Sequence, residues 1–170
     1  MEFVAPDFRD RAANGFNVVV AGKAFGCGSS RAEAVMSLIG CGITCVIAQS
    51  YAFIYARNSP SLGLMSVVVT DPEFYELAQD GEQVEVSLQE GVVKVAGKSF
   101  SFEFSELERK LMDLGGIAQA FQQHGKGMFE ALSKPNASSR AGGARVFGGG
   151  AGGKAGAAVG DSKEKAGLEW

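Results

Sequence analysis

The feature that most constrains the fold is an apolar run, residues 18–21, that leads into a glycine-rich loop and then into a helix-like segment. The loop covers residues 22–31 and reads Gly-Lys-Ala-Phe-Gly-Cys-Gly-Ser-Ser-Arg. The apolar run is typical of a buried strand, and apolar side chains at helical spacing follow the loop as far as residue 39. At a strand–loop–helix junction, unpaired backbone N–H groups and the positive end of the helix dipole face the same point. The sequence therefore predicts an anion-binding loop.

The loop does not follow the common phosphate-binding patterns. It lacks the spacing G-x-G-x-x-G, and no Gly-Lys-Ser/Thr closes it. It offers instead two hydroxyls and a guanidinium, from Ser29, Ser30 and Arg31. These groups suit a carboxylate, because arginine binds that group bidentately. On glycine spacing alone, a plain tight turn with Ser29 or Ser30 as the helix N-cap is an equally open interpretation.

Residues 22–31 resemble the signature of the swivelling domain of the aconitase superfamily, and in particular the small-subunit family of 3-isopropylmalate dehydratase. The resemblance continues through residues 42–59 and 63–64, and a short upstream segment, residues 6–8, fits it as well. It extends over residues 6–132. It implies an α/β fold of the swivelling β/β/α type, in which parallel strands with helices are followed by a small antiparallel meander.

The resemblance also implies roles for individual residues. Ser29 matches the serine that acts as the catalytic base in aconitase, while Ser30 and Arg31 match residues that bind the substrate carboxylate. Gly28 and Arg57 complete the expected substrate-binding set. For Arg57, a structural ion-pair or capping role is an equally open interpretation.

The expected cofactor of this family is a 4Fe–4S cluster that belongs to the large subunit, so we expect no cofactor and no metal on this chain. The sequence has three cysteines, Cys27, Cys41 and Cys45, and their spacing fits no common cluster-ligand run. The implied partner is a cluster-bearing large subunit in a heterodimer, with a homo-oligomer as the alternative. The implied ligand is a small anionic carboxylate.

Two departures from the family pattern stand out. Arg31 is followed by Ala-Glu-Ala, where the family motif continues Glu-His-Ala. The sequence also has no counterpart of the family's upstream Thr-Asp-x-Ile-Pro-like loop. We therefore expect a swivelling domain over residues 1–133 that is N-terminally shortened relative to the family.

Composition limits the remaining possibilities. The 170 residues carry a net charge of −3 without a stripe of lysine and arginine, which argues against nucleic acid as a partner. There is no apolar run long enough to span a bilayer and no secretory signal pattern at the N-terminus, so we expect a cytoplasmic protein without membrane contact. Residues 134–170 are rich in Gly, Ala, Ser and Lys, which predicts a disordered tail.

Periodicity predicts the remaining elements. The first strand, residues 18–21, is expected to be covered on both faces, and residues 1–17 to be irregular. Ser50 is expected to cap a short helix over residues 51–58, and a single last helix is expected over residues 117–132. The other predicted elements are strands at 43–48 and 64–69, helices at 31–39, 71–79 and 105–113, and a meander at 84–88, 92–95 and 100–104.

The predicted function is that of the small subunit of a hydro-lyase/isomerase. In this role the chain supplies a serine base and carboxylate-binding side chains to the dehydration and rehydration of a hydroxy-dicarboxylate. Two alternatives stay open. The first is a stand-alone, cluster-independent dehydratase, isomerase or cyclase of secondary metabolism, and the second is a non-catalytic interaction module.

Overall fold

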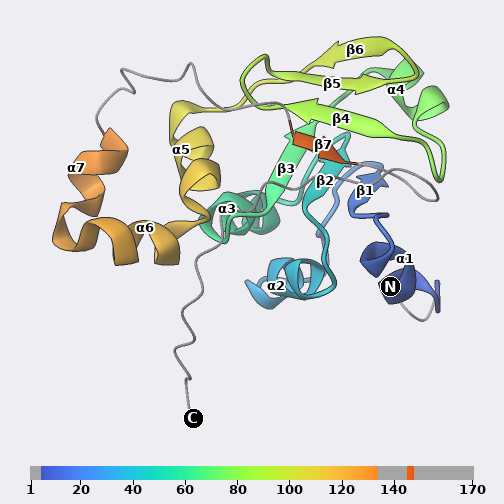
Figure 1. Ribbon diagram of the computed structural model, residues 1–170. Coiled ribbons are helices and arrows are strands. Elements are labelled where there is room, and N and C mark those ends of the chain that lie inside the picture. Colours follow the sequence, from blue (N-terminus) through green and yellow to red (C-terminus); the bar gives the residue numbers. More distant parts are fainter. Residues whose placement is uncertain (1–4, 134–144, 148–170) are drawn as a thin grey trace.

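The computed structural model describes residues 5–133 and 145–147, and these residues are arranged in three layers (Figure 1). A small antiparallel sheet lies at the top of the view, a parallel sheet lies in the middle, and helices α1 to α3 lie on the far side of the parallel sheet. The β/β/α layering predicted from the family resemblance is confirmed.

The parallel sheet has the strand order β1-β2-β3. Its strands are β1 (Val18–Ala21), β2 (Cys45–Ala48) and β3 (Met65–Val68), joined by helices α2 (Glu33–Gly40) and α3 (Phe53–Ser61). The register pairs Ala21 with Ala48, and Ala48 with Val68, so all three strands end at the same level. The loops that follow them therefore meet at one edge of the sheet.

The prediction that residues 18–21 are covered on both faces holds only in part, because Val18 and Val19 pack against the two different cores whereas Val20 is exposed. All four residues of β2 are buried, whereas β1 is an edge strand in which Val20 is 37% exposed. An apolar run indicates that its side chains are buried. It does not indicate whether the strand lies at the edge or in the centre of its sheet. That position is set by the tertiary topology.

The antiparallel sheet has the order β6-β5-β4-β7 and contains the predicted meander. Its first three strands are β4 (Val84–Ser87), β5 (Val92–Val95) and β6 (Lys98–Ser101). The fourth, β7 (Arg145–Phe147), pairs with β4 and was not predicted. Apart from β7, the predicted tail over residues 134–170 lies outside the described residues.

Two apolar cores hold the layers together. The first lies between the two sheets, where Phe74 of α4 (Pro72–Leu77) is fully buried and contacts Phe100 with ring centroids 5.4 Å apart. The second lies between the parallel sheet and the helices, and contains Val35, Leu38, Val46 and Tyr55. Helix α1 (Phe8–Ala13) contributes Ala12 to this second core, which explains why a segment predicted to be irregular forms a helix.

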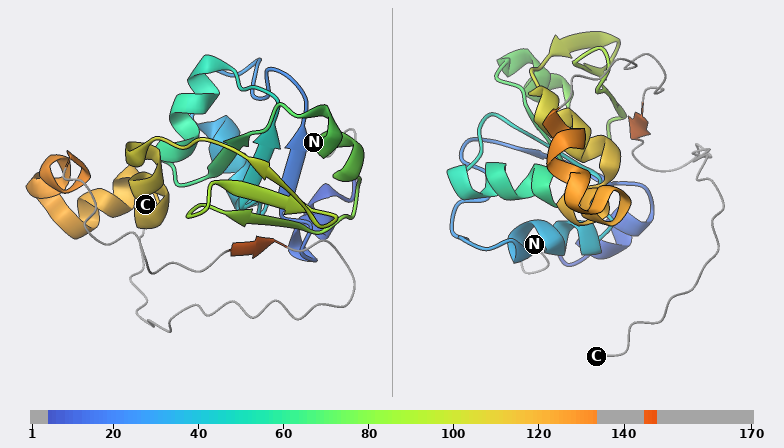
Figure 2. Two further views of the ribbon diagram at one scale, coloured as in Figure 1. Left: turned by 90° about the horizontal axis from the view of Figure 1, so that it is seen from above. Right: turned by 90° about the vertical axis from the view of Figure 1, so that its left-hand side faces the viewer.

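The last predicted helix, over residues 117–132, is interrupted. It consists of α6 (Ile117–His124), the 3₁₀ turn η1 (Gly125–Gly127) and α7 (Met128–Ser133), because Gly125 adopts a positive φ of 53°. Helix α5 (Glu106–Leu114) lies beside the sheets and contributes Met112 to the core between them, whereas α6 and α7 lie farther out (Figure 2). Among the described residues, no helix has the length and apolar character needed to cross a membrane.

A reciprocal hydrogen-bond pair fixes the start of α5. Ser105 Oγ accepts from the Glu108 N–H, and the Glu108 carboxylate accepts from the Ser105 N–H at 2.9 Å. Without these two hydrogen bonds, the N–H donors at the start of the helix would be unpaired.

Replacing Ser105 by alanine is expected to lower the free energy of unfolding by about 1 kcal/mol, because one N–H of the first turn loses its acceptor. Urea unfolding followed by circular dichroism measures this change. Ser99→Ala, at an exposed strand position, is the control and should change the free energy by less than about 0.5 kcal/mol. Equal effects of the two substitutions would contradict the capping role.

Phe74→Ala is expected to destabilise the protein by about 3–5 kcal/mol, because it leaves a cavity between the two sheets. Phe129→Ala is the matched control, since the Phe129 side chain is 81% exposed and its loss should be nearly neutral. Thermal and urea unfolding of both variants provide the comparison. A small effect at Phe74 would show that the two sheets do not depend on this core.

Candidate functional site

The predicted anion-binding loop lies at the edge where the parallel strands end. Residues 22–32 connect β1 to α2, and residues 49–52 connect β2 to α3 at the same level of the sheet. Of the predicted site residues, Gly28, Ser29, Ser30 and Arg31 lie in the first connection. Arg57 lies in the second turn of α3, which begins directly after the second connection.

Hydrogen bonds tie these two connections together. The Phe25 N–H donates to the Ser50 carbonyl at 2.9 Å, and the Ala52 N–H donates to the Phe25 carbonyl at 2.9 Å. The Ala24 N–H donates to Ser50 Oγ at 2.8 Å. The loop is therefore attached to the end of β2, and its path is fixed before it reaches Ser29.

The prediction that Ser50 caps the helix after β2 is wrong. Helix α3 begins at Phe53 with Ala52 in the N-cap position, and the Ser50 hydroxyl accepts from the loop instead. This contact was missed because a serine after a strand is consistent with either partner. The choice depends on which backbone donor the tertiary structure brings near it.

An aromatic cluster packs against the loop. The ring of Phe25 meets Tyr55 edge-on at 5.2 Å, and Tyr51 stacks on Tyr55 at 5.6 Å. Gly26 lies so close to Tyr55 that a Cβ at this position would be 2.4 Å from Cγ of the ring, and its φ is +82°. Glycine is therefore required at position 26, both for its backbone conformation and for lack of space.

The two tyrosines are structural rather than acid–base groups. The Tyr51 hydroxyl lies within donating distance of the carbonyls of Val46, at 2.7 Å, and Val67, at 2.9 Å, and so links β2 to β3. Burial raises the pKa of Tyr51 well above its usual range, and burial also raises the pKa of Tyr55 to about 12. Both phenols are therefore neutral at physiological pH.

Neither Ser29 nor Ser30 caps helix α2, so the plain-turn interpretation in its N-cap form is wrong. The N-cap position is occupied by Ala32, which has no side-chain hydrogen bond. Ser29 Oγ accepts from the Arg31 N–H at 3.2 Å. The first N–H groups of α2 consequently lack a side-chain partner and face the loop.

The side chains that precede α2 are accessible. Ser29 is half-buried, whereas Ser30 and Arg31 are exposed. Gly28 has a φ of +98° with open space where a Cβ would lie, so only its backbone conformation requires glycine. The loop can therefore be reached by a ligand from the solvent side.

Three basic side chains lie at this edge. Lys23, Arg31 and Arg57 are exposed, and none of them forms an ion pair with another residue of the described part of the chain. The Arg57 guanidinium lies 4.8 Å from the centroid of the Phe53 ring. Unpaired guanidinium groups beside free N–H groups favour an anionic ligand.

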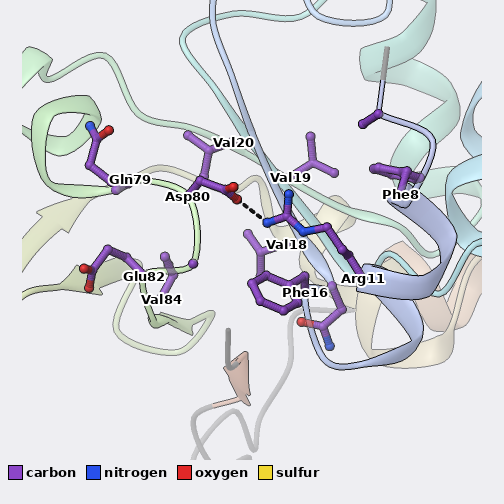
Figure 3. Close-up of a pocket in the computed structure, with 14 residues that line it drawn as sticks. Phe8, Arg11, Phe16, Val18, Val19, Val20, Gln79, Asp80, Glu82 and Val84 are labelled. Atoms are coloured by element: carbon purple, nitrogen blue, oxygen red, sulfur yellow. Dashed lines mark hydrogen bonds and ion pairs between the residues drawn. The ribbon is translucent and has the colours of Figure 1, made fainter. Parts of the chain in front are cut away.

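A pocket of about 310 Å³ lies along β1 and contains none of the predicted site residues (Figure 3). Val18, Val19 and Val20 line it, together with Phe16 and the pair Arg11–Asp80. The Arg11 guanidinium is already neutralised by the Asp80 carboxylate. This pocket is mostly apolar and offers no free cation, so it is not the predicted carboxylate site.

The described residues do not fit a metal cluster. They contain no group of three or more His, Cys, Asp and Glu side chains that could hold a metal ion. Cys27 is exposed in the loop and Cys41 is half-buried after α2. Cys45 is fully buried in β2, and this burial strongly raises the pKa of its thiol. His124 is an exposed residue at the end of α6.

Long fungal proteins are among the relatives of this chain. The chain is 46% identical over 140 residues to a protein of Glarea lozoyensis named 3-isopropylmalate dehydratase large subunit gloJ, and 48% identical over 132 residues to aconitase htyD of Aspergillus rugulosus. These matches cover 82% and 78% of the chain. They cover 16% and 15% of the two relatives, so the chain spans about one sixth of their length.

Shorter relatives match over most of their own length. The 3-isopropylmalate dehydratase small subunit 1 of Methanopyrus kandleri is 37% identical over 133 residues, which is 76% of each chain. The crystal structure of 3-isopropylmalate dehydratase (leuD) from Methanocaldococcus jannaschii superimposes with a TM-score of 0.57 and 32% identity, over 69% of this chain and 68% of that one.

A family model agrees with these relatives. The model described as the aconitase C-terminal domain matches residues 2–72, a range that contains the whole loop and both connections of the parallel sheet. The resemblance that the sequence carries is thus confirmed by identity, by fold and by the family model. The chain belongs to the small-subunit family of 3-isopropylmalate dehydratase, within the aconitase superfamily.

Proposed function

We propose that this chain is the swivelling domain of a hydro-lyase/isomerase that dehydrates and rehydrates a hydroxy-dicarboxylate. The observation that carries this proposal is the run Ser29-Ser30-Arg31 on a loop that is fixed to the sheet edge, with no ion pair at Arg31 within the described residues. Family membership supports the reaction class, and the roles below are assigned to individual side chains.

Binding of one substrate carboxylate is assigned to Arg31 and Ser30. The planar guanidinium can donate two parallel hydrogen bonds to a carboxylate. The Ser30 hydroxyl and the uncapped N–H groups at the start of α2 supply further donors. Gly28 allows the loop backbone to turn toward these donors, and Arg57 adds a second cation at the same edge.

Removal of the proton is assigned to Ser29. In the dehydration step, the Ser29 alkoxide takes the proton from the carbon next to a carboxylate, the C–H electron pair forms the carbon–carbon double bond, and the hydroxyl leaves the adjacent carbon as hydroxide. The Lewis acid for this hydroxide would come from the expected 4Fe–4S cluster. When water adds back with the proton and the hydroxyl on exchanged carbons, the product is the isomer. Serine is a weak base unless its alkoxide is stabilised, and the Arg31 N–H already donates to this oxygen at 3.2 Å.

The accessibility of the loop supports a role that depends on a second protein surface. Ser30, Arg31 and Arg57 are exposed, and charge interactions are weak where water is free to enter. A surface that closes over the loop would exclude water and strengthen every contact of the site. This requirement favours a two-part enzyme over a stand-alone catalyst built from this chain.

We assign the expected 4Fe–4S cluster to that second part, because the described cysteines do not form a cluster site. The second part is either a separate large subunit or a further region of the same polypeptide. The Methanopyrus small subunit supports the first arrangement, and the much longer fungal relatives support the second.

Ser29→Ala is expected to lower kcat by about 10²–10⁴-fold, because the reaction loses its general base. The assay combines the full chain with a cluster-bearing large subunit and follows turnover of 3-isopropylmalate. Ser37→Ala, an exposed serine of α2, is the control and should retain activity. Both variants should keep the melting temperature of the parent. An unchanged kcat for Ser29→Ala would refute the assignment of the base.

Gly26→Ala is expected to destabilise the chain by more than about 1 kcal/mol, because the new Cβ meets the Tyr55 ring and the positive φ is strained. Gly40→Ala is the matched control. Gly40 lies in helix α2 with no atom within 4 Å of a built Cβ, so alanine there should be neutral or slightly stabilising. Urea unfolding of both variants gives the comparison, and equal stabilities would show that the loop is not held against the aromatic cluster.

A further inference from the structure

The glycine-rich loop contains one residue in a conformation that its own side chain disfavours. Ala24 has a φ of 54°, which is strained for any residue that carries a Cβ. The other described non-glycine residue with a positive φ is Ala96, in the two-residue turn between β5 and β6, where a tight hairpin requires it. Ala24 lies in no hairpin, so its conformation must be held by contacts from elsewhere in the fold.

Ser50 supplies two of these contacts from the end of β2. Its Oγ accepts from the Ala24 N–H at 2.8 Å, and its carbonyl accepts from the Phe25 N–H at 2.9 Å. The carbonyl contact belongs to the backbone and would be available to any residue at position 50. The hydroxyl contact is made by the side chain alone, and it acts directly on the strained residue.

The orientation of Ala24 is passed on along the loop. The Ala24 carbonyl accepts from the Cys27 N–H at 3.1 Å, which closes a four-residue turn over residues 24–27. Gly26, at the third position of this turn, has a φ of 82°, the value that a type II turn needs there. Gly28 and Ser29 follow the turn directly. A rotation at Ala24 therefore redirects the whole turn and displaces the residues that come after it.

We propose that Ser50 is a positioning residue of the candidate site. Its hydroxyl favours the loop conformation with positive φ at Ala24, and this conformation presents Ser29 and Arg31 at the sheet edge. Without the hydroxyl, a larger fraction of the molecules relieves the strain at Ala24, the Phe25 pairing opens, and the site is displaced. This inference rests on the proposed function, because the roles of Ser29 and Arg31 are those assigned there.

The inference predicts a specific kinetic pattern. If only the conformation with positive φ at Ala24 binds substrate, the apparent KM rises by the inverse of the fraction that holds this conformation. Bound substrate selects the same conformation, so kcat at saturation stays constant. Loss of the base in Ser29→Ala has the opposite signature, because it lowers kcat.

The first test measures steady-state kinetics of the full chain assembled with a cluster-bearing large subunit, with 3-isopropylmalate as substrate. Ser50→Ala is expected to raise KM roughly fivefold at constant kcat, since one hydrogen bond contributes about that factor. Adding Ala24→Gly should restore the parent KM, because glycine adopts a positive φ without strain. Ser37→Ala, whose hydroxyl donates within α2, is the control and should change neither constant. An unchanged KM in Ser50→Ala, or a raised KM that Ala24→Gly does not restore, overturns the inference.

The second test uses the full chain alone and needs no activity. Hydrogen exchange followed by NMR should show the Phe25 and Ala52 amides, which join the two connections, exchanging roughly fivefold faster in Ser50→Ala. The amides of β2 should stay as protected as in the parent. Unchanged exchange at Phe25 and Ala52, or equal acceleration throughout β2, means that Ser50 does not control the loop. If the loop responds as expected while Ser29→Ala keeps full turnover, the proposed function fails and the control of the loop by Ser50 stands.

Discussion

The structure around the candidate site depends on one constraint, the attachment of the glycine-rich loop to the end of β2. Phe25 pairs with the chain on either side of Tyr51, and Gly26 lies directly against the Tyr55 ring. These contacts set the path of the loop, so Ser29, Ser30 and Arg31 emerge at a fixed position before α2. Without them, these three residues and the start of α2, which has no side-chain cap, would have no defined arrangement.

The two cores explain why this attachment is rigid. The parallel sheet is covered by the antiparallel sheet on one face and by α2 and α3 on the other, so β2 is buried along its whole length. The Tyr51 hydroxyl adds a link between β2 and β3 through the carbonyls of Val46 and Val67. The loop is therefore anchored to the least exposed strand of the fold, which limits its movement.

The same arrangement leaves Ser30, Arg31 and Arg57 open to solvent. A loop that is held rigidly by the sheet and is accessible from the solvent side is what a domain needs if a second surface completes its site. Arg31 and Arg57 form no ion pair within the described part of the chain, and in the proposed function their attraction for an anionic ligand increases when water is excluded. This division agrees with a family in which the cluster belongs to another part of the enzyme.

The sequence by itself determined the family, the order of strands β1 to β6 with the helices between them, and the loop with its two serines and arginine, because apolar periodicity and a glycine-rich motif are local signals. Only the tertiary structure decided that β1 is an edge strand, that Ser50 accepts from Ala24 rather than capping α3, and that Phe53 is exposed beside the loop. Each of these depends on which distant segment lies nearby. A local pattern records how apolar or polar a position is, whereas its neighbours across the fold determine what that position contacts.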